Sequence, residues 1–406
     1  MAKDWEKIIR AYALKNAIEH DGRAQESSVI SSLFHEGLEK EQVKDVIKQV
    51  KLIVAEVNKS SLDKQQKEFS KLEQNVDHRA ERVGLPELPD VPKTGVRMRF
   101  RPAPSGPLHV GHIISSMISS LFVKKYGGKW YIIVDDTNPE ETLQEAYKKI
   151  KEDFDWLFGN VTKYINSSDR MLIYYDYAEK LIKLGAVYVC TCKQEKFKEL
   201  VDKKKTCPCR KNDAKKNLEL WNKMLDKKGF KEGEAVLRFK SSIDNPNPAL
   251  RDFPLARINL VTHALQKNKY KVWPLMNLVV AVDDIELGMT HIIRGKDHRD
   301  NAERQKMIYQ ALGLENKFPW TFFMGRIKFS DIVLSKRKIK ASIEAGEYEG
   351  WDDPKLPTIS SLRKRGYSPE AFAKLAEQRG LSQVDKVMTQ KDFFDLLDKF
   401  NQEASS

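Results

Sequence analysis

Two short segments contain the residues whose types and spacing best suit phosphate chemistry. In the first, residues 96–100 are apolar and β-prone, a Pro/Gly/Ser turn follows, and a helix is expected to begin near His109. His109 and His112 would share one face at that helix start, where unpaired backbone N–H groups and the positive end of the helix dipole attract phosphate. The second segment, Val333-Leu334-Ser335-Lys336-Arg337-Lys338, places three cations in what we expect to be a short loop. Either segment alone is usually ordinary surface, but together they predict a triphosphate site.

The cysteines form a second constellation. They follow the pattern C-x-C-x14-C-x-C, with Cys190, Cys192, Cys207 and Cys209. Two close pairs separated by a loop suit a tetrahedral structural Zn²⁺, which prefers thiolates. The alternative is four reduced cysteines packed in a core, but the surrounding sequence is Lys-rich and polar. Residues 190–216 carry ten Lys or Arg against four acids, a surface suited to nucleic-acid phosphates.

Composition narrows the class of protein. The chain has 406 residues, enough for two to four domains, and a formal net charge of +13, which favours a polyanionic partner. The longest apolar run, near residues 273–282, is far shorter than a membrane span. The N-terminal residues lack the apolar core of a secretory signal, so we expect a cytoplasmic protein with no membrane association.

The order of predicted elements gives an α/β fold: a Rossmann-type parallel-sheet catalytic domain, an inserted zinc-bearing α+β domain and an N-terminal helical extension. Residues 5–59 predict two or three amphipathic helices, and a charged stretch and a Pro-rich linker follow. Residues 270–282 are predicted to resume the sheet. The predicted division is 1–94 (helical extension and linker), 95–186 (first catalytic half), 187–265 (insertion), 266–325 (second catalytic half) and 326–406 (lysine-motif loop and helical region).

Several motifs in order resemble class I aminoacyl-tRNA synthetases, and in particular the glutamyl/glutaminyl subgroup. The histidine and lysine segments resemble the two signature motifs of that class. The subgroup is indicated by Gly106-Pro107-Leu108-His109-Val110-Gly111-His112, Asp135-Asp136-Thr137-Asn138-Pro139, Ile293-Arg294-Gly295-Lys296-Asp297-His298 and Gly350-Trp351-Asp352-Asp353-Pro354. The helical N-terminal segment and the Arg294 motif are similar to the archaeal type of glutamyl-tRNA synthetase. The lysine segment and residues 357–363 are closer to glutaminyl enzymes.

The resemblance implies a glutamate–tRNA ligase that uses ATP with Mg²⁺, L-glutamate and tRNA(Glu). Positioning and electrostatics would dominate such chemistry. The implied catalytic residues are His109, His112, Lys336 and Lys338. The implied ATP-binding residues are Pro104, Gly106, His109, Gly111, His112, Ser335, Lys336, Arg337 and Lys338. The insertion, with structural Zn²⁺, would lie near the tRNA acceptor end.

For the amino acid, the resemblance implies contacts from Arg99 and Arg294 to the side-chain carboxylate and from Asp135 to the α-amino group. A bidentate arginine is a natural reader of a carboxylate. The chain departs from familiar members at three positions. Ile133 replaces a common arginine, Met276 stands where many relatives have a tyrosine, and Ala103 stands where some have a serine.

The alternative function is that of a non-canonical paralogue, either glutaminyl-tRNA synthetase-like or a truncated tRNA-binding or glutamyl-transfer protein. The reason for this alternative is that the sequence ends at Ser406, whereas family members continue past this point into anticodon-binding domains. Charging of tRNA(Gln) and the oligomeric state stay open. The N-terminal helices either bind a partner protein or form a solvated packing extension, and we favour the extension.

Overall fold

The computed structural model describes residues 4–20, 22–76, 84–106, 108–331 and 336–405. The chain divides into two compact units, Met1–Arg82 and Val83–Ser406. Among the helices of the described ranges, none is both long and apolar enough to span a bilayer. Short 3-10 turns punctuate both units: η1 (Lys40–Gln42), η2 (Glu73–Asn75), η3 (Pro139–Glu141), η4 (Ser167–Arg170), η5 (Pro208–Lys211), η6 (Pro248–Leu250), η7 (Lys296–His298) and η8 (Glu315–Lys317).

The N-terminal unit is helical, as predicted. Its helices are α1 (Trp5–Glu19), α2 (Glu26–His35), α3 (Val43–Val57) and α4 (Leu62–Leu72). The fourth lies in the charged stretch for which we predicted no element. Its Gln65 is fully buried, and the side-chain amide donates to the carbonyls of Gly22 and Val57 at 3.0 and 2.8 Å. The buried Gln65 amide therefore attaches α4 to the rest of the unit. The pattern of apolar residues does not reveal this helix.

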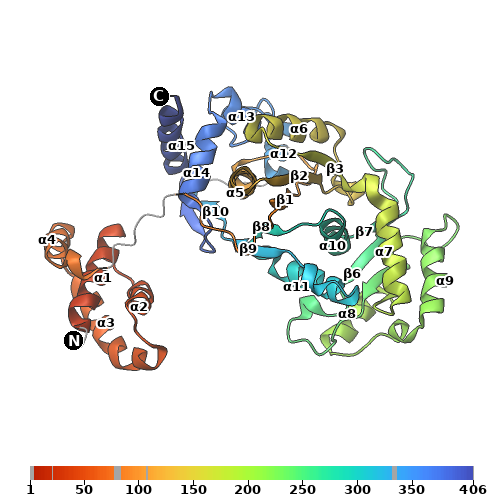
Figure 1. Ribbon diagram of the computed structural model, residues 1–406, viewed down its shortest axis with the longest axis horizontal. Helices are drawn as coiled ribbons and strands as arrows, with labels where there is room; N and C mark the ends of the chain where they lie inside the picture. Colours follow the sequence, from red (N-terminus) through yellow and green to blue (C-terminus); the bar gives the residue numbers. More distant parts are fainter. Residues whose placement is uncertain (1–3, 21, 77–83, 107, 332–335, 406) are drawn as a thin grey trace. The chain divides into compact units, whose positions relative to one another are not determined.

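The parallel sheet predicted for the second unit is confirmed. Strands β1 (Val96–Phe100), β2 (Gly128–Val134) and β3 (Lys163–Asn166) pair in parallel, as do β8 (His291–Gly295) and β9 (Trp320–Met324). The backbone N–H of Thr290 donates to the carbonyl of Arg97 at 3.0 Å and sets β8 beside β1. The described strands thus form a three-stranded sheet in the order β1-β2-β3, and the two-stranded sheet β8-β9 lies beside it at β1 (Figure 1).

Both faces of this sheet are covered, as expected for parallel strands. One face packs on α5 (Val110–Tyr126) and α6 (Gln144–Phe158) around Trp130 and Phe154. The other holds an apolar cluster formed by Tyr131, Ile133, Ile165, Met289 and Ile292.

The region of the predicted insertion, extended to residue 274, contains a four-stranded antiparallel sheet in the order β4-β5-β6-β7. Its elements are β4 (Val187–Cys190), α8 (Gln194–Asp202), α9 (Ala214–Leu225), β5 (Val236–Phe239), β6 (Pro254–Ile258) and β7 (Val272–Pro274), preceded by α7 (Met171–Lys183). The prediction that residues 270–282 resume the parallel sheet is wrong. Strand β7 pairs with β6, and α10 (Met276–Glu286) follows. Since α10 is buried on nearly every side, its apolar run looks like a strand in the sequence.

After α11 (Arg299–Ala311) and β9, the chain forms β10 (Ile327–Phe329), α12 (Lys336–Glu344), α13 (Ile359–Lys364), α14 (Pro369–Arg379), β11 (Lys386–Met388) and α15 (Gln390–Ser405). Strands β10 and β11 pair in parallel. In Figure 1, α14 and α15 lie at the end of this unit opposite α8 and α9. The short loop predicted for residues 336–338 is wrong, because they begin α12. Residues 336–344 favour helix, and Ile339 is buried.

Candidate active site

The two histidines cap the helix that they begin. His109 is the N-cap of α5, where the sequence predicted the start, and its Nδ1 accepts from the Gly111 N–H at 3.1 Å. The Nδ1 of His112 accepts from the His109 N–H at 3.4 Å, and the ring centroids lie 4.0 Å apart. Because each Nδ1 is an acceptor, each neutral ring carries its proton on Nε2. The pair therefore places two Nε2–H groups near the start of α5, at the positive end of the helix dipole.

A second segment holds this turn in place. The Val110 N–H donates to the Pro357 carbonyl and the Ile359 N–H to the Leu108 carbonyl, both at 3.1 Å. His109 and Thr358 form the antiparallel bridge between these bonds. Residues 357–359, which belong to a segment that resembles glutaminyl enzymes, therefore hold the histidine turn although they lie far from it in the sequence.

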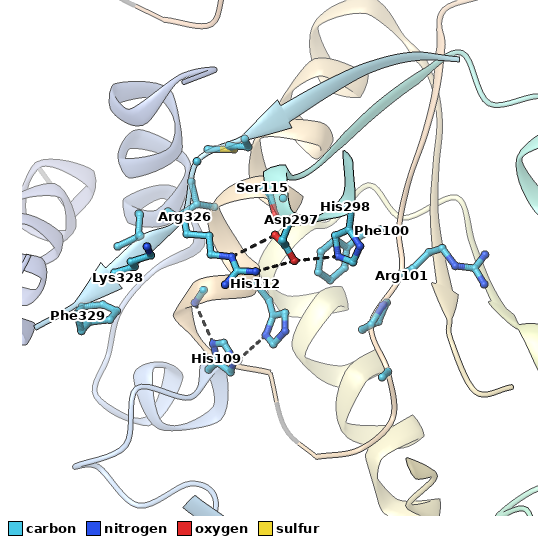
Figure 2. A pocket seen from close by; sticks show the side chains of 18 of the residues that line it. Phe100, Arg101, His109, His112, Ser115, Asp297, His298, Arg326, Lys328 and Phe329 are labelled. Atoms are coloured by element: carbon cyan, nitrogen blue, oxygen red, sulfur yellow. Dashed lines mark hydrogen bonds and ion pairs between the residues drawn. The ribbon is translucent and has the colours of Figure 1, made fainter. Parts of the chain in front are cut away.

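A pocket of about 920 Å³ opens at the histidines (Figure 2). Its ionisable lining residues are Arg101, His109, His112, Asp297, His298, Arg326 and Lys328. Asp297 is the only carboxylate among the described lining residues, and it forms an ion pair with Arg326 at 2.7 Å. Sequence reasoning gave no role to Arg326 or Lys328. The available signal was the alternation of basic residues along a strand, which places both on one face.

Asp297 and His298 face the same pocket (Figure 2). Burial would raise the pKa of Asp297, but the hydrogen bond from Arg326 and nearby positive charges lower it. Burial and the charge of Arg294 lower the pKa of His298, which favours the neutral form of its ring. A neutral His298 adds no charge to the pocket, and the Asp297 carboxylate offsets the charge of Arg326.

The other predicted ATP-binding residues are only partly brought together. Gly111 lines the pocket with the histidines, whereas Pro104 and Gly106 lie in the preceding turn outside its lining. Gly106 has φ 145°, a conformation that favours glycine. Ser335 lies outside the described residues. Lys336, Arg337 and Lys338 are placed by their backbone alone, in the first turn of α12, which carries no acidic residue.

Arg99 has a bidentate partner within the protein. Its Nε and Nη2 donate to the two carboxylate oxygens of Asp284, at 2.6 and 2.8 Å, and each side chain is 5% exposed. We expected Arg99 to make this bidentate contact with the carboxylate of the substrate. In this structure it stabilises the junction of β1 with α10.

Arg294 has a weaker set of partners. Its Nη1 donates to the side-chain oxygen of Gln305 at 2.8 Å, and its buried Nε has no partner among the described residues. Burial, the largest cause, and the nearby charges of Arg99 and Arg101 lower its pKa to about 9. Arg294 is half-buried and has no carboxylate at ion-pair distance among the described residues, so it is an incomplete ion pair that an anionic ligand would complete.

Asp135 and Asp136 follow β2 and have different surroundings. Asp136 is fully buried and accepts from the N–H and hydroxyl of Ser168, both at 2.7 Å. Asp135 is 24% exposed, and one carboxylate oxygen lies 3.6 Å from Nη2 of Arg101. Asp136 is therefore structural, while Asp135 can reach a ligand. Sequence reasoning missed Arg101, although arginines at positions 97, 99 and 101 alternate along one strand face.

Of the three departures, Ile133 is fully buried in the apolar cluster around Tyr131, so its side chain has no polar task. Met276 is the first residue of α10 and is half-buried. Ala103 lines the pocket.

The four cysteines converge as their spacing predicted. Their Sγ atoms all lie within 4.8 Å of one another, and the pairs Cys190–Cys207 and Cys192–Cys209 are 3.8 Å apart. A tetrahedral zinc with Zn–S bonds of about 2.3 Å requires S···S distances of about 3.8 Å. The backbone N–H of Thr191 also points to Cys209 Sγ at 3.5 Å, as outer-shell donors do. The donor set and its dimensions fit structural zinc.

Comparison with known proteins agrees with these features. Residues 95–402 match the model of the family described as tRNA synthetases class I (E and Q), catalytic domain. A glutamate–tRNA ligase of Thermococcus kodakarensis is 42% identical over 392 residues, which are 94% of this chain and 68% of the relative. One of Methanocaldococcus jannaschii is 43% identical over 399 residues, 97% of this chain and 71% of the relative.

The fold has a solved counterpart. A crystal structure of a glutamate tRNA ligase from Elizabethkingia meningosepticum, in complex with its amino acid, aligns with a TM-score of 0.54. The sequence identity is 19%, and the alignment covers 76% of this chain and 69% of the other. With a family model that spans most of its length and archaeal relatives above 40% identity, the chain belongs to the class I tRNA synthetases of the glutamate and glutamine group.

Proposed function

We propose that this chain activates L-glutamate with ATP to glutamyl-adenylate and transfers the glutamyl group to the 3′ end of tRNA(Glu). As a member of its family it is an ATP-dependent aminoacyl-tRNA ligase, and its archaeal relatives are named for the glutamate reaction. A fold alone does not establish a function, so the proposal depends on the site. The observation that carries it is the pair of mutually capping histidines at the mouth of a cationic pocket.

In the activation step, the glutamate α-carboxylate attacks the α-phosphorus of ATP, and pyrophosphate leaves. The protein positions the two groups and stabilises negative charge on the phosphate oxygens. We assign phosphate contacts to the Nε2–H groups of His109 and His112. Arg326 and Lys328 also line this pocket, where Arg326 pairs with Asp297 and Lys328 with Asp385. Lys336 and Lys338 would hold the β- and γ-phosphates, with Ser335 and Arg337 beside them, and Mg²⁺ would accompany the phosphates.

For the amino acid, we assign the side-chain carboxylate first to Arg294. Among the described residues its guanidinium has no carboxylate partner and its Nε has no hydrogen bond. Arg99 would contribute through its electrostatic field and its remaining N–H groups, since Asp284 already occupies its fork. Asp135 would accept from the substrate's α-ammonium group. Two arginines near the carboxylate favour glutamate over glutamine, because a neutral amide would leave the Arg294 charge uncompensated.

We assign one Zn²⁺ to Cys190, Cys192, Cys207 and Cys209, where four thiolates close the coordination shell and give a structural role. The basic insertion around it would position the tRNA acceptor end through phosphate contacts. The division into 1–94, 95–186, 187–265, 266–325 and 326–406, and a cytoplasmic location, stay our predictions. Clustered thiols in a metal-binding geometry suit a reducing compartment.

An ATP–pyrophosphate exchange assay with glutamate, glutamine and aspartate, with and without tRNA, tests the function. Glutamate should support exchange best. Exchange that is faster with glutamine would overturn the substrate assignment. Tight tRNA binding without exchange by any of the three amino acids would overturn the proposed activity.

A further inference from the structure

Arg101 is a buried cation to which the proposed reaction assigns no substrate contact. It follows β1, and its side chain is 6% exposed. Nη1 donates to an oxygen of Asp283 at 2.6 Å, and Nη2 donates to the Ser167 hydroxyl at 2.8 Å. The same Nη2 lies 3.6 Å from Asp135. One guanidinium therefore joins a fully buried carboxylate on α10 to the partly exposed carboxylate after β2.

Asp283 does not need all of the charge on Arg101. Its other oxygen accepts from Nε of Arg170 at 2.8 Å, and the Tyr174 hydroxyl lies 2.9 and 3.0 Å from the two oxygens. The guanidinium of Arg170 alone balances the single negative charge of Asp283. The second positive charge, on Arg101, is then balanced by the next carboxylate within reach, which is Asp135.

The cost of burying Arg101 indicates that this arrangement is specific. Burial lowers the pKa of Arg101, but Asp135 and Asp283 outweigh burial and raise that pKa above its ordinary value. Its Nε has no hydrogen-bond partner among the described residues. The side chain is thus held by charge rather than by a complete set of hydrogen bonds.

We infer that Arg101 is a positioning residue for amino-acid binding, which fixes the Asp135 carboxylate in the orientation that receives the substrate's α-ammonium group. The inference rests on the proposed function, in which Asp135 makes that contact. Arg101 itself touches neither the ammonium group nor the phosphates in this assignment. Its effect must pass through Asp135.

A double-mutant cycle tests this dependence. The variants are Arg101→Gln, Asp135→Asn and the double variant, each assayed by pyrophosphate exchange over a range of glutamate concentrations. Arg101→Gln should raise KM for glutamate about tenfold, with kcat and KM for ATP within about twofold of the wild-type values. In the Asp135→Asn background the same change should alter KM for glutamate less than about twofold. Arg101→Lys keeps the positive charge but loses the two-pronged guanidinium, so its KM for glutamate should lie between those of the wild type and Arg101→Gln. In the Asp135→Asn background, Arg101→Lys should also change this KM less than about twofold.

Arg170→Gln is the matched control, because Arg170 supplies the other guanidinium on Asp283 and forms no ion pair with Asp135 in the described part of the chain. Its KM for glutamate should stay near the wild-type value. The inference would be overturned if the increase in KM for glutamate of the double variant equalled the product of the two single-variant increases. It would also be overturned if Arg170→Gln raised this KM as much as Arg101→Gln. If Arg101→Gln fails to fold, Arg101→Lys decides by the same comparison. Failure of the proposed function looks different, since the wild-type protein would then give no exchange with glutamate.

Discussion

Asp153 should make the protein less stable at neutral pH than the same chain with asparagine there. The carboxylate lies on α6, is 4% exposed and accepts one long hydrogen bond, 3.4 Å, from Ser360 of α13. Its other oxygen has no partner in the described ranges. Burial raises the pKa of Asp153 from the ordinary 3.8 to about 6.

The sign of the effect follows from proton linkage. Between about pH 4 and 6 the folded state binds this proton more readily than the unfolded state, so stability falls as pH rises. Above pH 6 the cost is complete, and the interval from 3.8 to about 6 corresponds to about 3 kcal/mol. At pH 5 the same pKa values leave about half of that cost. Asparagine keeps an acceptor for Ser360 and removes the charge.

Urea unfolding of the Asp153→Asn variant measures the difference. We expect a gain of about 1–3 kcal/mol at pH 7.5 and about half of it at pH 5. Asp155→Asn is the control on the same helix, because Asp155 is exposed and paired with Lys151 and Tyr164, which lower its pKa. That variant should gain nothing at either pH. A gain for Asp153→Asn that is equal at both pH values, or a loss at pH 7.5, would refute the reasoning.

Three further predictions concern the site. His109→Ala, His112→Ala and Lys338→Ala should each slow pyrophosphate exchange more than tenfold, a loss of over ~1.4 kcal/mol of transition-state stabilisation; near wild-type exchange in the histidine variants would make the pair a capping device only. Arg294→Gln should raise KM for glutamate without loss of thermal stability, whereas Arg99→Gln should also lower Tm because it leaves Asp284 buried and unpaired; an unchanged KM in either variant removes that arginine from glutamate recognition. Elemental analysis should find one zinc per chain, and its removal should weaken use of tRNA more than use of ATP; a metal-free protein with four freely titratable thiols would contradict the zinc site.

Local signals made the catalytic half predictable. The β-prone residues before a Pro/Gly/Ser turn gave β1, and the histidine after that turn gave the N-cap of α5. The cysteine cluster was equally accessible, because each pair is local and the loop between them is short. In each case the residues that decide the structure lie close together in the sequence.

The missed features depend on distant partners. Arg99 was expected to be available for the substrate, but Asp284, 185 positions away, takes its fork. Strand β11, with three residues, exists because β10 pairs with it, and neither has a strong pattern of its own. Helix α4 depends on the buried amide of Gln65. A periodicity argument over one window cannot detect such contacts.

The bridge between residues 357–359 and the histidine turn has a consequence for biosynthesis. The chain emerges from the ribosome N-terminus first, so β1, α5 and β2 are available long before Pro357 is translated. Until then the carbonyl of Leu108 and the N–H of Val110 lack the partners that they have in the finished protein. The nucleotide pocket should therefore mature late, and nascent chains stalled before residue 357 should bind ATP poorly even when the parallel sheet has formed.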